Sequence, residues 1–565
     1  MHKITPLAIC FAALAWELGH GVAAQPLRNP FDFPIVLSGN FGEFRPNHLH
    51  SGLDFKTQQR EGWPVHAVLD GYVSRIAVSP WGYGNVIYMT HGDSLVTVYA
   101  HLQRFADSLA AHVKARQYEA ERFQVDLNLP PGLFAFNRGD VIAYSGNSGS
   151  SAGPHLHFEV RDTRTGDVLD PLPFYSDRIK DTRQPGLLSL TVYPSEGLGV
   201  VNGSTEKLQL QPAVAKDGSI SFRHVPEAWG RIGFAVNADD YMDGTSNVYG
   251  VKEIVMSVDG QEVFHSYLDR FSFDESRCIN AWTDYEAWVE KRRFHTKTFV
   301  EPGNRFRFVT GRNRGFVTVD EPRTYRIDFQ LTDASGNTCR FGLNVTGKEQ
   351  PVPAPDTAGT TLFYRQSDSR FGARGIRLFI PRRSLYGGSL YFRYAAAPDS
   401  GGMADMHVLH DRPVALHRPA RLSLRLRRDD AADRRQYGIV SIRNGRSNWA
   451  GGVYRDGWID ADISELGCVY TIRVDSVAPV ITPVAPSRWT ASQTVTFRLT
   501  DNLSGVDTWR ATIDGEYALF AMDGRKSLIS YRFDPERLKR GAHVLHLTVA
   551  DACGNRSEFE TEFEW

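Results

Sequence analysis

The chain has 565 residues, of which 42% are hydrophobic and 23% charged, a composition typical of globular proteins with about three or four domains. Its 64 basic and 65 acidic residues leave a formal net charge of -1, which argues against a nucleic-acid partner because such binding needs a basic surface. After the N-terminus no run reaches the roughly 18 apolar residues of a membrane span, so we expect no transmembrane segment.

The N-terminus has the pattern of an export signal. After a short basic start, an apolar run extends from Ile4 to Trp16, and Val22-Ala23-Ala24 supplies small residues before Gln25. A buried N-terminal helix is the alternative, but it does not explain the small-residue site. We therefore predict that residues 1–24 are a signal peptide and that the protein is exported.

Residues 25–187 are predicted to form the first domain, which is rich in Gly and His. Short β-prone runs alternate there with turn signals such as His91-Gly92-Asp93, which favours an antiparallel sheet. Apolar residues recur every four positions from Phe105 to Val113, so residues 105–123 are expected to form a helix inserted between two strands. We expect this insert to help wall a substrate groove; a surface helix unrelated to substrate is the alternative.

Three histidine motifs lie within this first region. They are His48-Leu49-His50-Ser51-Gly52-Leu53-Asp54, Tyr99-Ala100-His101-Leu102, and the segment from Ser148 to Glu159. Alternate side chains of a strand share a face, so His155 and His157 in the third motif are expected to point the same way. Two imidazoles on one strand face, beside a third on a neighbouring strand, suit zinc, which binds His nitrogen and Asp oxygen.

An internal repeat characterises the chain from about residue 188 onward. The matching pairs are Gly250-Val251 with Gly505-Val506, Asp259-Gly260 with Asp514-Gly515, and Asp333 to Asn337 with Asp551 to Asn555. In the first copy the Asp-Gly pair and the segment that begins at Asp333 are farther apart along the chain than their counterparts in the second copy. This difference predicts an insertion around residues 266–301.

The repeat predicts the architecture of the C-terminal two thirds. We expect Ig-like β-sandwiches at residues 188–349, with the insertion, and at residues 476–565, separated by a β-rich domain at residues 356–475. The chain as a whole is therefore predicted to be mainly β. No cluster with metal-ligand spacing occurs after residue 188, so these modules are expected to bind or position rather than catalyse.

One acidic loop, from Asn237 to Gly244, resembles a calcium loop without matching it. An EF-hand needs an oxygen ligand where Tyr241 stands and a Glu where Gly250 stands. We expect a turn at the end of a strand there.

Four cysteines remain after the predicted signal: Cys278, Cys339, Cys468 and Cys553. In an oxidising compartment they allow three disulfide pairings, and isolated buried thiols are an equal alternative. The sequence does not decide between these states.

The histidine motifs carry a family resemblance. His50 with Asp54, Tyr99 to Leu102 and Pro154 to Glu159 are similar to the motifs of the lysostaphin/LytM-type zinc endopeptidases. The resemblance covers about residues 34–172 and implies a LytM-type peptidase domain. It further implies that His50, Asp54 and His157 hold one zinc ion per chain. The same resemblance makes His101 and His155 the catalytic pair that acts on a metal-activated water.

The resemblance also implies a substrate and a location. Enzymes of this kind cut peptidoglycan stem peptides, and the D-alanyl-diaminopimelate bond in the periplasm or cell envelope is the expected target. Cleavage of Gly-rich proteins outside the cell is a second enzymatic interpretation. The alternative from another class is a non-catalytic LytM-type scaffold that regulates other wall hydrolases. A further alternative makes the β modules an adhesion array or the binding site of an envelope protein.

Overall fold

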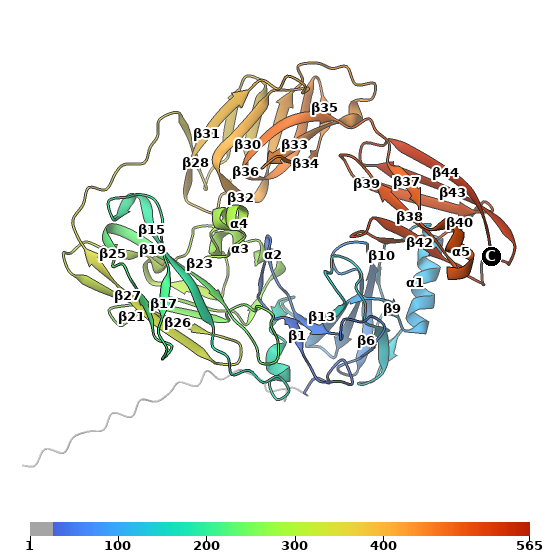
Figure 1. Cartoon of the computed structure of the whole chain (residues 1–565), viewed down its shortest axis with the longest axis horizontal. Helices are drawn as coiled ribbons and strands as arrows, with labels where there is room; N and C mark the ends of the chain where they lie inside the picture. Colours follow the sequence, from blue (N-terminus) through green and yellow to red (C-terminus); the bar gives the residue numbers. More distant parts are fainter. Residues whose placement is uncertain (1–25) are drawn as a thin grey trace, which may run out of the picture.

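The computed structural model describes residues 26–565 and confirms a mainly β protein (Figure 1). The predicted signal peptide lies outside the described residues. Within residues 26–565, none of the helices combines the length and the apolar character that crossing a membrane requires.

The first unit, residues 26–185, is built on one antiparallel sheet, as predicted. Its strands follow the order β1 (Leu37–Gly39), β4 (Leu53–Lys56), β13 (His155–Asp162), β8 (Leu95–Leu102), β7 (Asn85–His91), β6 (Gly71–Val78) and β10 (Val125–Asn128), with β11 (Ala135–Phe136) on β6 and β14 (Val168–Leu169) on β13. Smaller elements complete it: β5 (Pro64–His66), β12 (Val141–Tyr144) and β9 (Arg104–Phe105) form a second sheet, β2 (Phe44–Arg45) and β3 (His48–Leu49) form a hairpin, and η1 (Leu172–Tyr175) is a 3-10 turn.

The helix predicted within residues 105–123 is confirmed as α1 (Asp107–Glu119). Leu109 and Val113 are buried, as their spacing predicts, because one face of the helix packs on the first unit.

The second unit, residues 186–347, consists mainly of one large sheet around one core. The sheet order is β16 (Leu208–Leu210), β15 (Gly186–Val201), β19 (Glu227–Asp239), β27 (Thr338–Gly347), β26 (Thr324–Thr332), β20 (Glu253–Val258), β21 (Gln261–Tyr267) and β24 (Val309–Gly311). The shorter elements are β17 (Pro212–Val214), β18 (Ile220–Phe222), β22 (Arg270–Phe271), β23 (Thr296–Lys297), β25 (Val317–Val319), α2 (Phe273–Ser276), α3 (Ile279–Trp282), α4 (Tyr285–Lys291) and η2 (Arg312–Gly315). The three α-helices lie within residues 266–301, the segment that the sequence predicts to be an insertion.

The third unit, residues 360–474, is a nine-stranded sheet. It contains β28 (Thr360–Tyr364), β29 (Ser369–Ala373), β30 (Ile376–Ile380), β31 (Ser389–Ala397), β32 (Met406–Arg425), β33 (Tyr437–Arg443), β34 (Arg446–Gly451), β35 (Val453–Arg455) and β36 (Trp458–Val474), with η3 (Arg434–Gln436). The long strands β32 and β36 run antiparallel along most of their length and form its spine.

The fourth unit, residues 480–564, is a sandwich of two four-stranded sheets that share one core. One sheet has β37 (Val480–Pro483), β38 (Thr494–Thr500), β42 (Leu528–Arg532) and β41 (Ala521–Asp523); the other has β40 (Glu516–Ala518), β39 (Val506–Ile513), β43 (Ala542–Asp551) and β44 (Arg556–Glu564). Two short helical turns, η4 (Pro486–Arg488) and α5 (Trp489–Ser492), connect β37 to β38.

The repeat predicted from the sequence forms matching hairpins in the second and fourth units. Asp259-Gly260 joins β20 to β21, and Asp514-Gly515 joins β39 to β40. All four residues have positive φ, between 50° and 89°, the backbone that two-residue hairpin turns need and that Asp-Gly tolerates. The Ig-like classification of these two units stays a prediction.

The first two units share their cores. Met242 and Tyr249 of the second unit are buried among side chains of the first. Conversely, Phe41, Leu49 and Val168 of the first unit are buried in the core of the second. The predicted domain division between residues 187 and 188 stays a prediction, and these shared contacts argue that the two units fold together.

The four cysteines are buried free thiols. Of the two states that the sequence allows, isolated thiols are the one observed.

The fourth unit closes the chain into a circuit by docking on α1 of the first unit (Figure 1). The amine of Lys114 lies 2.7 Å from Asp534 and 2.9 Å from Glu536, and the rings of Tyr118 and Tyr517 are 5.7 Å apart. The helix that we expected to wall a groove is therefore the platform for the C-terminal sandwich.

This closure predicts a zero-length cross-link. A carbodiimide should join Lys114 to Asp534 or Glu536 in the intact chain, because the amine and the carboxylates are in contact. Peptide mass spectrometry measures the product, and Lys114→Arg should abolish it while keeping the charge. The exposed pair Lys348 and Glu227, 2.8 Å apart, is the internal control. A cross-link at the control pair without one at Lys114 would contradict the closure.

Candidate metal centre

Three neighbouring strands bring the histidine motifs together. In the order β4, β13, β8, His157 pairs with Asp54 on one side and with Ala100 on the other. His155 and His157 share a face of β13 while Leu156 points into the core, as the period of two predicts.

A β-bulge places His101. Between Asn85 and Ile87 of β7 the pairing slips by one residue, so that β8 carries an extra residue next to His101. His101 itself has a φ of 59°. Bulges of this kind redirect a side chain, and here the imidazole turns toward His155, with ring centroids 4.8 Å apart.

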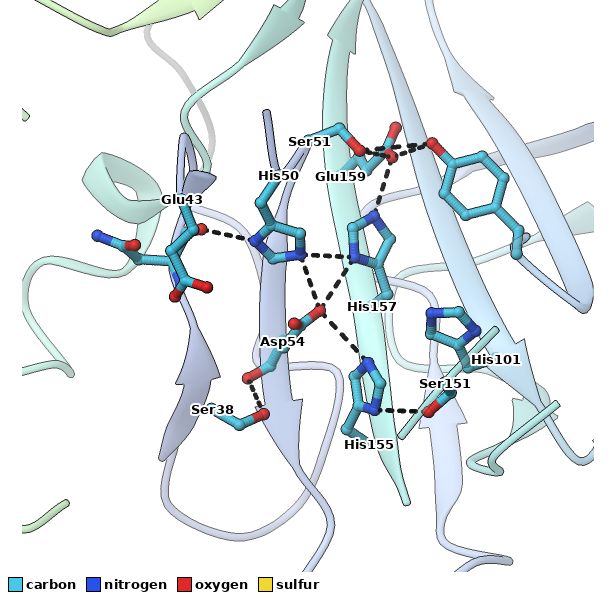
Figure 2. Close-up of polar contacts among 12 residues, drawn as sticks. Ser38, Glu43, His50, Ser51, Asp54, His101, Ser151, His155, His157 and Glu159 are labelled. Carbon is cyan, nitrogen blue, oxygen red and sulfur yellow. Dashed lines mark hydrogen bonds and ion pairs between the residues drawn. The ribbon is translucent and has the colours of Figure 1, made fainter. Parts of the chain in front are cut away.

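His50, Asp54 and His157 form a compact triad (Figure 2). Nε2 of His50, Oδ1 of Asp54 and Nδ1 of His157 are each 3.0 Å from the other two. The side chains are buried, with at most 8% of each residue exposed. Gly39 makes room for the carboxylate, since a Cβ there would lie 2.7 Å from Oδ2 of Asp54.

The hydrogen bonds on the far side of the two imidazoles fix which nitrogen faces the triad. Nδ1 of His50 lies 2.6 Å from the Asn40 carbonyl, and Nε2 of His157 lies 2.9 Å from the Glu159 carboxylate. Both oxygens only accept hydrogen bonds, so these nitrogens carry the protons and the nitrogens in the triad present lone pairs.

This donor set fits zinc. Two imidazole nitrogens and a carboxylate oxygen are the ligand types of catalytic zinc, and bonds of about 2.0 Å in a tetrahedron separate ligand atoms by about 3.3 Å. Three acceptor atoms 3.0 Å apart repel one another unless positive charge lies between them.

The protonation of the site shows the same demand for positive charge. Although burial opposes it, hydrogen bonds to Asp54 and Glu159 raise the pKa of His157 to about 9. Burial also works against ionisation of Asp54, yet His50, His155 and His157 hold the pKa of that carboxyl well below its usual range. The triad therefore favours a cation.

His101 and His155 flank the triad without being part of it. Nδ1 of His101 lies 2.9 Å from the Ser148 carbonyl and Nδ1 of His155 lies 2.8 Å from the Gly153 carbonyl. Nε2 of His155 is 3.4 Å from Oδ1 of Asp54. Burial, together with the charges of His155 and His157, lowers the pKa of His101 to about 3, so that this imidazole is neutral at pH 7.

Glu159 is the functional residue that the sequence reasoning missed. This residue of β13 lies outside the triad, but its carboxylate is fully buried and holds His157, while accepting hydrogen bonds from Ser51 (2.6 Å), Tyr83 (2.5 Å) and Arg161 (2.7 Å). The signal was present, because Glu159 is two residues after His157 and shares its strand face.

His48, two residues before His50 in the same motif, lies apart from the triad. It is exposed, and its Nδ1 contacts the Pro46 carbonyl.

Known proteins match this region. The family model described as "Peptidase family M23" matches residues 48–121, and one described as "Zu5-like domain" matches residues 360–475. An uncharacterized metalloprotease of Haemophilus influenzae is 35% identical over 161 residues, which are 27% of each protein. The DD-carboxypeptidase/endopeptidase Mpg of Neisseria meningitidis is 33% identical over 113 residues, 20% of each protein. The match therefore spans about a quarter of the length of these relatives.

A solved structure is similar to part of the chain. The catalytic domain of lysostaphin from Staphylococcus simulans is 25% identical, with a TM-score of 0.18 and coverage of 24% of this chain and 87% of that one.

Substitution of Glu159 tests whether its hydrogen bond to His157 supports metal binding. Partners that orient a metal-binding histidine typically contribute about 10- to 100-fold in metal affinity, so Glu159→Gln should weaken Zn²⁺ binding by that factor. Competition with a chromophoric chelator measures the change. Glu253→Gln is the matched control, because Glu253 also bonds a histidine, His265 at 3.0 Å, outside the triad. Equal zinc affinities of the Glu159 and Glu253 variants would contradict this role.

Proposed function

We propose, from the premise that the chain contains a peptidase family M23 domain, that this protein is an exported zinc metalloendopeptidase that hydrolyses peptide bonds in peptidoglycan cross-links. One observation carries the proposal. Three acceptor atoms of His50, Asp54 and His157 converge, with two further imidazoles beside them, in the arrangement that a catalytic zinc needs.

We assign the three residues of the triad to the metal and the two flanking histidines to proton transfer. Bound zinc would act as a Lewis acid, which polarises a peptide carbonyl and lowers the pKa of bound water. His50, Asp54 and His157 would hold it, and Glu159 and the Asn40 carbonyl orient the two imidazoles.

The two flanking histidines differ in their hydrogen bonds, and we assign them different roles. His101 has an acceptor only at Nδ1, so its Nε2 is free to take a proton. His155 faces an acceptor at each nitrogen, the Gly153 carbonyl and the Asp54 carboxylate, so it is placed to donate a hydrogen bond rather than to accept one. His101 is therefore the base, and His155 stabilises the developing oxyanion or protonates the leaving amine.

The substrate proposal is supported by the names of similar proteins. Mpg of Neisseria meningitidis is a DD-carboxypeptidase/endopeptidase, and a protein of Vibrio cholerae that is 30% identical over 150 residues is a peptidoglycan DD-endopeptidase. We propose stem peptides as the substrate, with the D-alanyl-diaminopimelate bond as the one cut, and the periplasm or cell envelope as the location.

The remaining units position the peptidase. Arg525 of the fourth unit donates to the Asn147 carbonyl at 2.8 Å and also contacts the Ser151 carbonyl, on the loop before His155. Ser151 in turn contacts His155 at 3.1 Å. This contact supports a positioning role for the C-terminal sandwich, beside binding of an envelope protein or the wall.

Digestion of purified peptidoglycan tests the function. The zinc-loaded protein should release stem-peptide fragments with a new amino terminus, a chelator should stop the release, and added zinc should restore it. A scaffold that regulates other hydrolases would release nothing by itself under any of these conditions.

Substitution of the five residues separates metal binding from proton transfer. Ala at His50, Asp54 or His157 should remove the zinc, whereas His101→Ala and His155→Ala should keep it and lose about 10²- to 10⁴-fold in kcat. Metal analysis and muropeptide turnover are the measurements.

His48→Ala is the matched control, because His48 lies two residues from His50 yet outside the triad. It should keep both zinc and turnover. Full zinc retention by His157→Ala would sink the ligand assignment.

A further inference from the structure

A second group of acidic residues, two buried and one half-buried, lies at the junction of the first and second units. Asp181 precedes β15 by five residues, Asp240 follows β19 directly and Asp333 follows β26 directly. One carboxylate oxygen from each lies within 4.8 Å of the others. Three separate segments of the chain thus meet at one corner of the second unit.

The carboxylate of Asp240 has no hydrogen-bond partner. The residue is fully buried, with 0% of its surface exposed, and neither of its oxygens accepts a hydrogen bond. Oδ2 of Asp181 is buried and unpartnered as well. Buried polar groups are almost always bonded, so bare carboxylate oxygens aimed at one another indicate a missing ligand.

The guanidinium of Arg183, whose charge acts on Asp240, does not bond to these carboxylates. Arg183 lies over the ring of Tyr241 and donates to the Thr245 carbonyl. Burial and the carboxylate of Asp333 raise the pKa of Asp240 to about 8. Without a cation, the carboxyl of Asp240 therefore keeps its proton at pH 7, and a bound cation would take the place of that proton.

The same corner recurs in the fourth unit. Asp475 precedes β37 by five residues, Asp501 follows β38 directly, and Asp551 occupies the repeat position of Asp333. Their carboxylates also lie within 4.8 Å of one another, and Oδ1 of Asp501 is buried without a partner.

The surrounding hydrogen bonds match in detail. Nδ2 of Asn337 donates to the Asp181 carbonyl at 3.1 Å, and Nδ2 of Asn555 donates to the Asp475 carbonyl at 2.9 Å. Nδ2 of Asn337 donates to Asp333 and that of Asn555 to Asp551, at 2.8 and 2.7 Å. Two corners built alike in separate units indicate a common purpose rather than an accidental cluster of charge.

We propose that each corner binds a Ca²⁺ ion, one held by Asp181, Asp240 and Asp333 and one by Asp475, Asp501 and Asp551. The ligands are all oxygens, which select a hard cation over zinc. Calcium takes six to eight oxygens in a flexible arrangement, so three carboxylates leave positions for water. A cavity of about 370 Å³, lined in part by Lys180, Asp181 and Ser335, lies beside the first corner and admits that water.

The position of the corners defines what the ions do. Asp181 lies in the connection between the first and second units, and Asp475 in the connection between the third and fourth. The loop after Asp240 continues to Gly250, which exchanges two hydrogen bonds with the side chain of Asn40, whose carbonyl orients His50. Calcium therefore stiffens two junctions, and the first of them supports the metal triad.

Calorimetric titration of the zinc-loaded full chain with CaCl₂ is the first experiment. The wild type should bind two ions, Asp240→Asn one, and the Asp240→Asn/Asp501→Asn double variant none. Asp217→Asn, which removes the same charge from an exposed turn of the second unit, should still bind two. Equal stoichiometry in the wild type and Asp240→Asn, or a preference for Mg²⁺, would overturn the proposal.

Thermal unfolding and proteolysis provide the second readout. Without calcium, Asp240→Asn should raise the Tm, because it removes a buried carboxylate that makes no hydrogen bond. With calcium, the wild-type Tm should rise, trypsin cleavage at the exposed Lys180 and Arg183 should slow, and the variant should show neither change at this corner. A wild type that calcium neither stabilises nor protects contradicts the proposal, whether or not it cuts peptidoglycan.

Discussion

Four histidine tautomers, each fixed by an oxygen acceptor, are the constraint on which the chemistry of this chain depends. In each ring one nitrogen donates a hydrogen bond to an oxygen. The acceptors are the carbonyls of Asn40, Ser148 and Gly153 and the carboxylate of Glu159. The other nitrogen of His50 and of His157 faces the triad and can act as a ligand. In His155 it faces the Asp54 carboxylate, and in His101 it is free to exchange a proton. Because three of the four acceptors are backbone carbonyls, the shape of the loops around the sheet, rather than any one side chain, sets the chemical state of the site.

Glu159 is the one acceptor that is a side chain, and its surroundings explain how a buried carboxylate is stable there. A buried carboxylate is costly unless it is paired and hydrogen-bonded, and Arg161, Tyr83 and Ser51 supply those partners. Burial opposes the effect, but Arg161 and His157 keep the pKa of Glu159 at about 2. It therefore stays ionised and keeps the ring of His157 oriented across the physiological pH range.

The parts of this structure that follow local periodicity could be predicted, and those that depend on distant packing could not. A period of two on β13 placed His155 and His157 on one face, and helical spacing identified α1. The same period places Glu159 on the face of His157. A carboxylate at that position can either orient the histidine or lie on the surface, and only its burial in the folded chain distinguishes these two roles. The acidic corners could not be recognised because their ligands lie on three segments, about 60 to 150 residues apart in the first corner and about 25 to 75 in the second, so no loop motif of the EF-hand type describes them. The contact of the fourth unit with α1 joins residues about 400 positions apart and leaves no local signal.

The second and the fourth unit both contact the surroundings of the metal triad. The second unit acts through Gly250 and Asn40 on His50, which we assign to metal binding. The fourth unit acts through Arg525 on the loop from Asn147 to Ser151, and that loop contacts His155, which we assign to proton transfer. A chain of modules attached at one end would leave the site independent of everything beyond the first junction. In a chain that closes on itself, the contact of Arg525 with the loop before His155 depends on the geometry of all four units. A ligand that bends the junction between the third and fourth units would therefore change the surroundings of His155 without touching the contacts of His50, so at that junction proton transfer, as we assign it, is more open to regulation than metal binding.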